Sequence, residues 1–281
     1  MRRDPLTSEI RRLAWRALCG GSLLWLTACG GSSGGGGPLP PSSANPGTTP
    51  TTPTTPIDPS LPAAACLNTA LYSTAGTRTA LTYTSEGGGS TQQVQQFATV
   101  AAIATTFNGQ TANALNVREV VQTVGTPSSE VRFDGTHYVA LSDHQVQLLG
   151  TVSRYRSQGS MVTQTLALSP SLTDLDFRLA VGGSTVAASS VISASVSPAS
   201  GAGTASLNAS SAVTFVGFET ITVPAGTFTD ACKFEQRVTT GSSRVTTRWL
   251  AKGSGVVLRV DAGGTIQRLV SGTLNGAVIT P

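Results

Sequence analysis

Residues 77–85 read TRTALTYTS, and this alternating stretch decides the fold class. Thr79, Leu81 and Tyr83 recur at every second position, and Arg78 and Thr82 fall between them. Successive side chains of a strand point to opposite faces, so a period of two is typical of a strand with one buried face. We therefore predict a β-strand over residues 77–85.

Segments of the same kind follow along the chain, and turn residues separate them at short intervals. They cover residues 113–123, 145–152, 162–168, 186–196, 212–223, 231–240, 244–251, 255–261 and 265–274. Residues 131–133 and 138–141 are expected to form a hairpin across Asp134-Gly135. Many short strands at such spacing indicate a sandwich, a barrel or a strongly curved sheet. We predict an all-β fold whose antiparallel, strongly curved sheet forms a half-barrel or an open barrel.

The stretch from Val94 to Phe107 fits two kinds of secondary structure. Val94, Phe97 and Val100 lie three apart, as on one face of a helix, whereas residues 97–107 alternate, as in a strand. Side chains that branch at Cβ are frequent here, and such side chains favour strands. We therefore predict a strand.

The charge balance points to an export signal and away from nucleic acid. The chain has a net charge of +4, from 18 basic and 14 acidic residues. Five of the basic and two of the acidic residues precede Cys29, so 13 and 12 remain after it. No run of Lys or Arg that could follow a phosphate backbone occurs after Cys29, and we expect no nucleic-acid partner.

The first 28 residues have the parts of a secretory signal. Arginines fill the start, a short apolar stretch ends at Leu26, and the small residue Ala28 precedes Cys29. The sequence Leu26-Thr27-Ala28-Cys29 resembles the lipobox of bacterial lipoproteins. An ordinary secretory signal followed by a chance cysteine is the alternative.

The lipobox resemblance implies that the chain is cut between Ala28 and Cys29 and carries a diacylglycerol on the Cys29 thiol. Several acyl chains together hold a protein on a membrane stably. The resemblance further implies that Gly30 after the cysteine favours the outer membrane. We expect an exported, lipid-anchored protein that faces the periplasm or the cell surface.

Residues 30–65 are rich in Gly, Pro, Ser and Thr and lack apolar periodicity, so they are expected to form a disordered tether. The predicted organisation is a signal peptide at 1–28, the lipidated Cys29 and tether at 29–65, and a single β-domain at 66–281. Within that domain only Cys66 and Cys232 remain as thiols. In an oxidising compartment such a pair indicates a disulfide, and two buried free thiols are the alternative.

Two motifs resemble segments of uncharacterised proteobacterial envelope proteins. The first is Val-Pro-Ala-Gly-Thr-Phe at 223–228, followed by Cys232, and the second is Trp-Leu-Ala-Lys-Gly-Ser-Gly at 249–255. The resemblance implies an antiparallel β-protein, in some relatives like the open half-barrel of lipoprotein carriers, but no activity. This sequence has Leu250 where the relatives usually have Tyr.

The residues of these motifs suit structural roles. Pro224 and Gly226 are expected to form a tight turn between two strands. Phe228 and Trp249 are expected to pack in the core, while Gly253 and Gly255 let the chain turn back.

Candidate catalytic residues are few. His137 and His144 lie near Asp134 and Asp143, so an Asp–His pair could orient a base for a serine nucleophile, but Gly-x-Ser-x-Gly does not occur. A solvated strand or turn is the favoured environment for both histidines. The pair Asp174 and Asp176 would share one face of a strand, and a solvated loop is favoured there too. We predict no metal site and no cofactor.

The leading functional hypothesis is a non-enzymatic, lipid-anchored envelope module. It would bind an apolar or extended ligand in its curved sheet, or contact another envelope component. A hydrolase that uses His137 or His144 is one alternative, and a purely structural surface protein is another.

Overall fold

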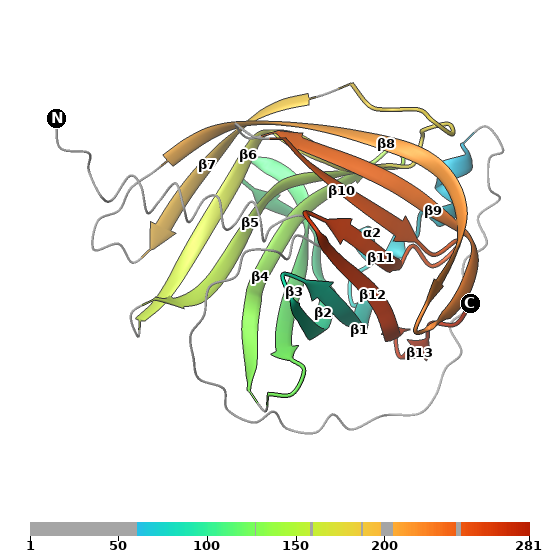
Figure 1. Cartoon of the computed structure of the whole chain (residues 1–281). Helices are drawn as coiled ribbons and strands as arrows, with labels where there is room; N and C mark the ends of the chain where they lie inside the picture. The colour runs from blue at the N-terminus through green and yellow to red at the C-terminus, as the bar shows by residue number, and fades with distance from the viewer. Residues whose placement is uncertain (1–60, 127, 158–159, 187, 198–204, 240–242) are drawn as a thin grey trace.

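A computed structural model describes residues 61–126, 128–157, 160–186, 188–197, 205–239 and 243–281. The predicted signal peptide, Cys29 and the tether up to residue 60 lie outside the described residues. Across these ranges, two short helical segments precede thirteen strands (Figure 1). Within them, no helix is both long and apolar enough to cross a membrane.

The helical segments and strands follow one another along the chain. They are η1 (Pro62–Cys66), α2 (Ala70–Ser73), β1 (Arg78–Gly87), β2 (Ser90–Phe107), β3 (Gln110–Thr123), β4 (Ser129–Ser142), β5 (Gln145–Ser157), β6 (Ser160–Asp176), β7 (Ala188–Ser197), β8 (Ala205–Val223), β9 (Gly226–Thr239), β10 (Ser243–Leu250), β11 (Val257–Ala262), β12 (Thr265–Leu274) and β13 (Ala277–Val278).

The sheet closes into a twelve-stranded antiparallel barrel. Each strand from β1 to β12 pairs with its neighbours in sequence order, and β1 also pairs with β12. This seam runs from Thr79 opposite Leu274 to Glu86 opposite Ile266. The prediction of an all-β, antiparallel and strongly curved sheet is confirmed, and the curvature goes further than a half-barrel because the seam leaves neither β1 nor β12 as a free edge.

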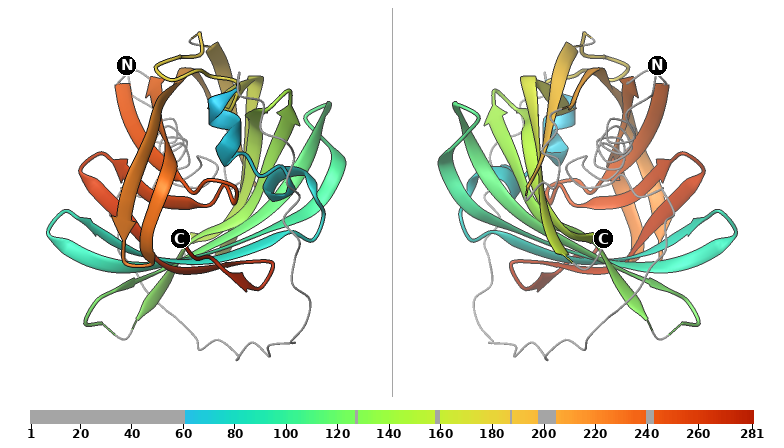
Figure 2. Two further views of the ribbon diagram at one scale, coloured as in Figure 1. Left: turned by 90° about the vertical axis from the view of Figure 1, so that its right-hand side faces the viewer. Right: turned by 90° about the vertical axis from the view of Figure 1, so that its left-hand side faces the viewer.

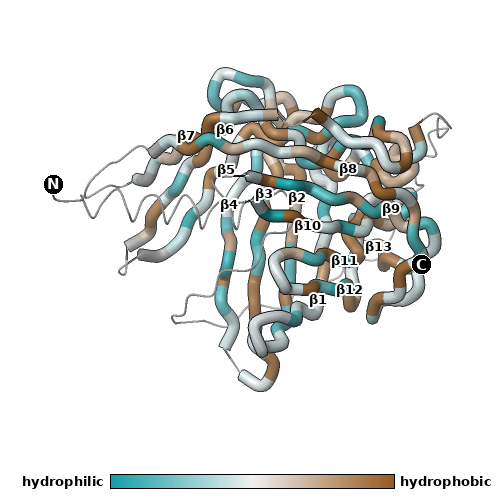
Figure 3. Tube along the Cα trace, turned by 45° about the horizontal axis from the view of Figure 1, so that its top comes forward, coloured by the Kyte–Doolittle hydropathy of each residue, from teal (hydrophilic) through white to brown (hydrophobic). Residues whose placement is uncertain are grey.

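The strands follow the alternation read from the sequence. In β1 the side chains of Thr79, Leu81 and Tyr83 are buried, and those of Arg78 and Thr82 are not. The ambiguous stretch at 94–107 is strand, as predicted, and makes up most of β2. Polar and apolar residues alternate along many strands (Figure 3).

Two-residue turns join several of the hairpins. At Asn108-Gly109, between β2 and β3, φ is +48° and +76°, which is the left-handed conformation of type I′ turns. Both residues of the turn also have positive φ at Gly88-Gly89, Asp143-His144, Gly263-Gly264 and Asn275-Gly276.

The predicted hairpin across Asp134-Gly135 is wrong, because both residues lie inside the continuous strand β4. Gly135 is there for close approach to the next strand and not for a turn. A Cβ at this position would lie 2.3 Å from the carbonyl oxygen of Val152 on β5. The chain turns instead at Asp143-His144.

We call residues 62–73, which comprise η1 and α2, the plug. A barrel of about eight strands is just filled by its own side chains, so twelve strands leave a wider interior. The plug lies on the inner side of the curved sheet (Figure 2), where η1 contacts β9 and α2 contacts β2, β3 and β4. Because η1 includes residues 62–65, the folded part begins before Cys66.

The barrel has two ends with different contents. β1 begins beside the plug, so the turns at Asp143-His144 and Pro224-Ala225 share this end, which we call the plug end. The far end carries the turns at Gly88-Gly89 and Gly263-Gly264. The main apolar cluster combines the plug with side chains from most of the strands, and a second, smaller cluster joins β6, β7 and β8.

Candidate functional site

The plug is held by a disulfide and by the two sequence motifs. Cys66 and Cys232 are bonded, with their Cα atoms 6.1 Å apart, so the predicted disulfide is present. Pro224-Ala225 forms the turn between β8 and β9 that begins the strand of Cys232, and Phe228 on that strand is buried. The first motif therefore places the cysteine that fixes the plug.

The second motif forms a socket for the plug. The backbone N–H of Gly253 donates to the carbonyl oxygen of Ala65 at 2.8 Å, and Asn68 Nδ2 donates to the carbonyl oxygen of Ser254 at 3.2 Å. Gly255 has φ +67°, and a Cβ there would lie 3.0 Å from the carbonyl oxygen of Cys66. A side chain at Gly255 would therefore push the plug away.

Trp249 is buried, as predicted, but its polar neighbours show that it lies toward the outer face. Its Nε1 donates to Glu219 Oε2 at 2.9 Å. The Lys233 ammonium lies 5.1 Å and the Arg259 guanidinium carbon 4.8 Å from the ring centroid. These three charged side chains cover the indole, and each stays partly exposed or exposed itself.

A buried ion pair crosses the barrel at the plug end. Arg248 on β10 donates to both carboxylate oxygens of Asp174 on β6, at 2.9 and 3.2 Å, and to Gln236 Oε1 at 2.6 Å. The Arg248 and Asp174 side chains are 2% and 4% exposed. Gln236 in turn donates to Ser211 Oγ and to the carbonyl oxygen of Thr173. The network ties together strands that are not neighbours.

The predicted solvated loop at Asp174 and Asp176 is therefore wrong, because both carboxylates are buried at the end of β6. A β-bulge explains the inward position of Asp174: Thr173 and Leu175 pair with successive residues of β5, which leaves Asp174 as the extra residue. The buried Tyr72 of the plug lies near this pair, and its pKa is raised above the ordinary range by burial first and by Asp174 second.

The two histidines do not form a common site. His137 lies inside the barrel, 2% exposed, so its predicted solvated environment is wrong, and its ring stacks on Phe133 at 4.9 Å across the intervening Gly135. Asp134 has the opposite parity on β4 and is exposed, so it does not face His137. His144 occupies the exposed turn, as predicted.

Burial lowers the pKa of His137 to about 4, and the nearby Asp174 opposes this shift only in part. The imidazole is therefore neutral at pH 7, and its Nδ1 makes no hydrogen bond to the described residues. Asp143, the other predicted carboxylate partner, binds Arg178. The Asp–His arrangement needed for a serine hydrolase is not assembled among these side chains.

A second buried acid lies toward the far end. Glu119 is 5% exposed, and burial raises its pKa to about 7, against the opposing effect of Arg132. Arg132 Nη1 lies 3.6 Å from Glu119 Oε1, and Arg132 Nη2 donates to Gln92 Oε1 at 2.8 Å. Arg132 is the extra residue of a bulge in β4, which lets it reach both acceptors from the rim.

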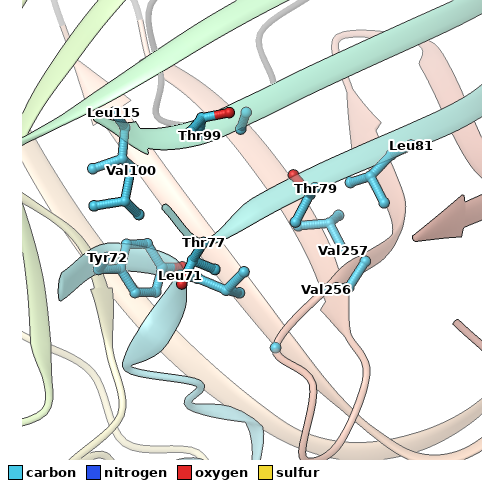
Figure 4. Close-up of a pocket in the computed structure, with 12 residues that line it drawn as sticks. Leu71, Tyr72, Thr77, Thr79, Leu81, Thr99, Val100, Leu115, Val256 and Val257 are labelled. Atoms are coloured by element: carbon cyan, nitrogen blue, oxygen red, sulfur yellow. The ribbon is translucent and has the colours of Figure 1, made fainter. Parts of the chain in front are cut away.

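A small apolar pocket lies between the plug and the barrel wall (Figure 4). Leu71 and Tyr72 of the plug face Leu81, Val100 and other wall residues across it. Its volume is about 30 Å³, which suits about one water molecule. Known apolar cavities that bind benzene measure about 150 Å³, so this pocket is too small for an apolar ligand unless the plug moves.

A larger opening, which we call the rim groove, lies at the plug end beside β6 and β8. Its volume is about 510 Å³. The lining residues are mainly polar: Gln145, Thr173, Asp176, Arg178, Leu179, Ser184, Thr185 and Val186.

A hydrogen-bond network forms the floor of this groove. Arg178 donates from Nε and Nη2 to the two carboxylate oxygens of Asp176, at 2.9 and 2.7 Å, and from Nη1 to Asp143 at 3.1 Å. Gln145 Nε2 also donates to Asp176 at 3.0 Å. Burial alone would raise the pKa of Asp176, but the hydrogen bonds from Arg178 and Gln145 outweigh it and hold the pKa below its usual value.

Sequence reasoning missed Arg248, Glu119, Gln236 and Arg178. Charged and amide side chains on alternating strands are normally assigned to the solvent face, so nothing local marked the first three as interior. Across the described ranges, no three His, Cys, Asp or Glu side chains come together in a way that could hold a metal ion.

Comparisons with known proteins give one distant structural likeness. No protein-family model matches the chain, and no curated protein matches it. A solved structure from Parabacteroides distasonis ATCC 8503, described as a "putative lipoprotein", resembles this fold with a TM-score of 0.38 and 15% sequence identity. The likeness covers 72% of this chain and 97% of that one.

Proposed function

We propose that the chain is an exported lipoprotein that binds a component of the cell envelope without catalysing a reaction. Leu26-Thr27-Ala28-Cys29 supports the lipid anchor. The observation that carries the binding role is the filled barrel: the plug and the Arg248–Asp174 pair occupy the plug end. A barrel that is filled by its own chain offers its outside and its rim for contact.

The separate positions of His137 and His144 support the absence of catalysis. His137 is stacked and buried, and His144 sits in a turn on the surface. A general base must reach the proton that it removes within hydrogen-bond distance, directly or through one water. A buried His137 would need the barrel to open first.

The small volume of the plug pocket supports one of the two forms of the binding hypothesis. An apolar carrier needs a cavity on the order of 300–1,000 Å³. The apolar pocket here has about 30 Å³. We therefore favour contact with an envelope component over transport of an apolar ligand inside the barrel.

The anchor is tested with the full chain, signal included, in a Gram-negative host. The wild-type protein is expected in the membrane fraction, with an intact mass that corresponds to residues 29–281 plus a diacylglycerol and an N-acyl chain. Cys29→Ser should lose the lipid mass and the cut before residue 29, whereas Cys19→Ser, a cysteine of the leader, should change nothing. An unmodified wild-type mass, or a lipid mass that Cys29→Ser retains, would contradict the proposal.

A further inference from the structure

We propose that the rim groove binds a neutral, hydroxyl-rich ligand of the saccharide class. This inference rests on the proposed binding role and names the ligand class for it. The groove has about 510 Å³, which lies within the range of about 300–1,000 Å³ that is usual for small-molecule sites. Six of its eight lining residues are polar, so the lining suits a polar ligand better than an apolar one.

The charges at the groove disfavour an anion. Arg178 carries one positive charge, and its two partners Asp176 and Asp143 carry two negative charges. The low pKa of Asp176 keeps it ionised at neutral pH. The resulting local charge of −1 would repel a phosphate or a carboxylate that approached Arg178.

The hydrogen bonds of the carboxylates disfavour a metal ion. Asp176 already accepts from three nitrogens of Arg178 and from Gln145. A hard cation such as Ca²⁺ needs about six to eight oxygen ligands. The described part of the chain contains no group of three metal-binding side chains, and the groove residues are no exception.

The backbone of the groove disfavours a peptide that would bind as an added strand. The N–H groups of Gly182 and Thr185 donate to the carbonyl oxygens of Phe215 and Val213 on β8, and Gly183 accepts from Phe215. This segment is therefore already used as a strand on β8. A ligand in the groove would therefore form its hydrogen bonds mainly with side chains.

Those donors match a saccharide. Arg178 uses three of its five N–H groups on carboxylates and keeps two. Thr173 adds a hydroxyl group. The hydroxyls of Ser184 and Thr185 already bond Thr214 Oγ1 and the N–H of Val213, and each keeps capacity for a further hydrogen bond. Leu179 and Val186 give two apolar patches, which suit the C–H face of a sugar ring. A fixed guanidinium, hydroxyl groups with remaining hydrogen-bonding capacity and two small apolar patches suit the hydroxyl groups and C–H faces of a neutral sugar.

The test uses the purified full-length lipoprotein in detergent on a panel of neutral glucose, mannose and N-acetylglucosamine oligosaccharides. We expect saturable binding to at least one of them. Ser184→Trp and Val186→Trp should each weaken it at least tenfold, because both side chains line the groove and are exposed, Val186 at 91%. Ser189→Trp, at an exposed serine of β7 outside the groove, is the matched control and should bind like the wild type.

Thermal unfolding of each variant checks that the fold is kept. If Ser184→Trp does not fold, Val186→Trp replaces it as the groove variant in the binding test. Binding to none of the neutral oligosaccharides, or binding that both groove variants leave unchanged, would overturn the inference and leave the anchored module standing. The mass of the bound oligosaccharide is measured after incubation. Cleavage would keep the saccharide site but overturn the non-catalytic function.

Discussion

The interior of the barrel is filled with different side chains at the plug end and at the far end. A twelve-stranded barrel is too wide for its own side chains to fill. At the plug end, residues 62–73 enter the barrel, and Tyr72, Phe177 and Phe234 are buried with them. Toward the far end, polar side chains share the buried positions with apolar residues such as Tyr83 and Val94. The polar ones include Ser85, Gln96, Glu119, Gln164 and Gln267.

This difference shows that a β-barrel interior need not be uniformly apolar. Where the chain supplies a plug, apolar packing and one ion pair hold the walls together. Where it supplies none, amide and carboxyl groups are buried among the apolar side chains. The plug end should therefore carry most of the stability. Both ends should contribute to its pH dependence, through Glu119 toward the far end and through His137 near Asp174.

The largest effect is expected from the disulfide. Cys66 and Cys232 are 166 residues apart, and a loop of that length gives about 5 kcal/mol in the chain-entropy model, less where the unfolded chain keeps structure. The double variant Cys66→Ala/Cys232→Ala should lose about 3–5 kcal/mol of unfolding free energy in urea titrations. Reductant should destabilise the wild type and leave this variant unchanged. Equal stability of the two oxidised proteins would show that the plug needs no clamp.

The buried ion pair should come next. Arg248→Met leaves Asp174 without its charge partner in the interior, which costs about 3–5 kcal/mol in comparable cases. Arg248→Met combined with Asp174→Asn should recover part of this loss. Urea unfolding of the single and double variants measures the coupling. Additive losses would mean that the two side chains do not interact as the structure has them.

A leucine-to-alanine substitution in each apolar cluster compares how much the two clusters contribute to the unfolding free energy. Leu258 is fully buried in the main cluster beside the plug, and Leu168 is 4% exposed in the small cluster of β6, β7 and β8. Leucine-to-alanine changes cost about 2–5 kcal/mol, and more where the surroundings cannot collapse. Leu258→Ala should fall near the upper bound and Leu168→Ala near the lower one in thermal and urea unfolding. A larger loss in Leu168→Ala than in Leu258→Ala would contradict the claim that the plug end carries most of the stability.

The smallest net effect on the unfolding free energy of the wild type is expected from the titration of Glu119, and its pH dependence tests the burial of this side chain. Its folded pKa of about 7 lies above the ordinary 4.5, so its contribution to stability is full below pH 4.5 and is lost as the pH rises to 7. At pH 8, Glu119→Gln should be more stable than the wild type by up to about 3 kcal/mol, since a unit of pKa is about 1.4 kcal/mol.

His137 should act in the opposite direction. Its folded pKa of about 4 lies below 6.5, so its contribution is full above pH 6.5 and is lost as the pH falls to 4. The two slopes largely cancel in the wild type between pH 4.5 and 6.5. In that window stability should rise with pH in Glu119→Gln and fall with pH in His137→Asn. If the unfolding free energy changed in the same direction with pH in both variants, Glu119 and His137 would not be buried as the structure has them.

The sequence predicts the strands well because each carries its own alternation, as residues 77–85 show. Closure could not be predicted, since the seam joins Thr79 to Leu274 and no local pattern marks a pairing across so many residues. The hairpin predicted at Asp134-Gly135 does not form because Gly135 allows a close contact with Val152 inside a continuous strand. The disulfide was predictable because the cysteines had no other partner in the domain.

The interior charges show where pattern reading fails. In β10, Val245 and Trp249 share one face, and Thr246 and Arg248 share the other, so the alternation favours an inward tryptophan. The structure has the opposite register: Arg248 binds Asp174 inside, and Lys233 and Arg259 cover Trp249 from outside. The partners come from strands far apart in sequence, so hydrophobicity alone could not assign the faces.

Hydrogen–deuterium exchange of the full-length protein tests the central claim, a closed barrel filled by its own N-terminal segment. Peptides that cover β1, β12 and the plug are followed together. Slow exchange in β1 and β12, equal to that of β3, and slow exchange in α2 are the predicted result. Fast exchange along β1 or β12 would reveal an open edge, and fast exchange in the plug alone would reveal an empty barrel; either result would contradict the account.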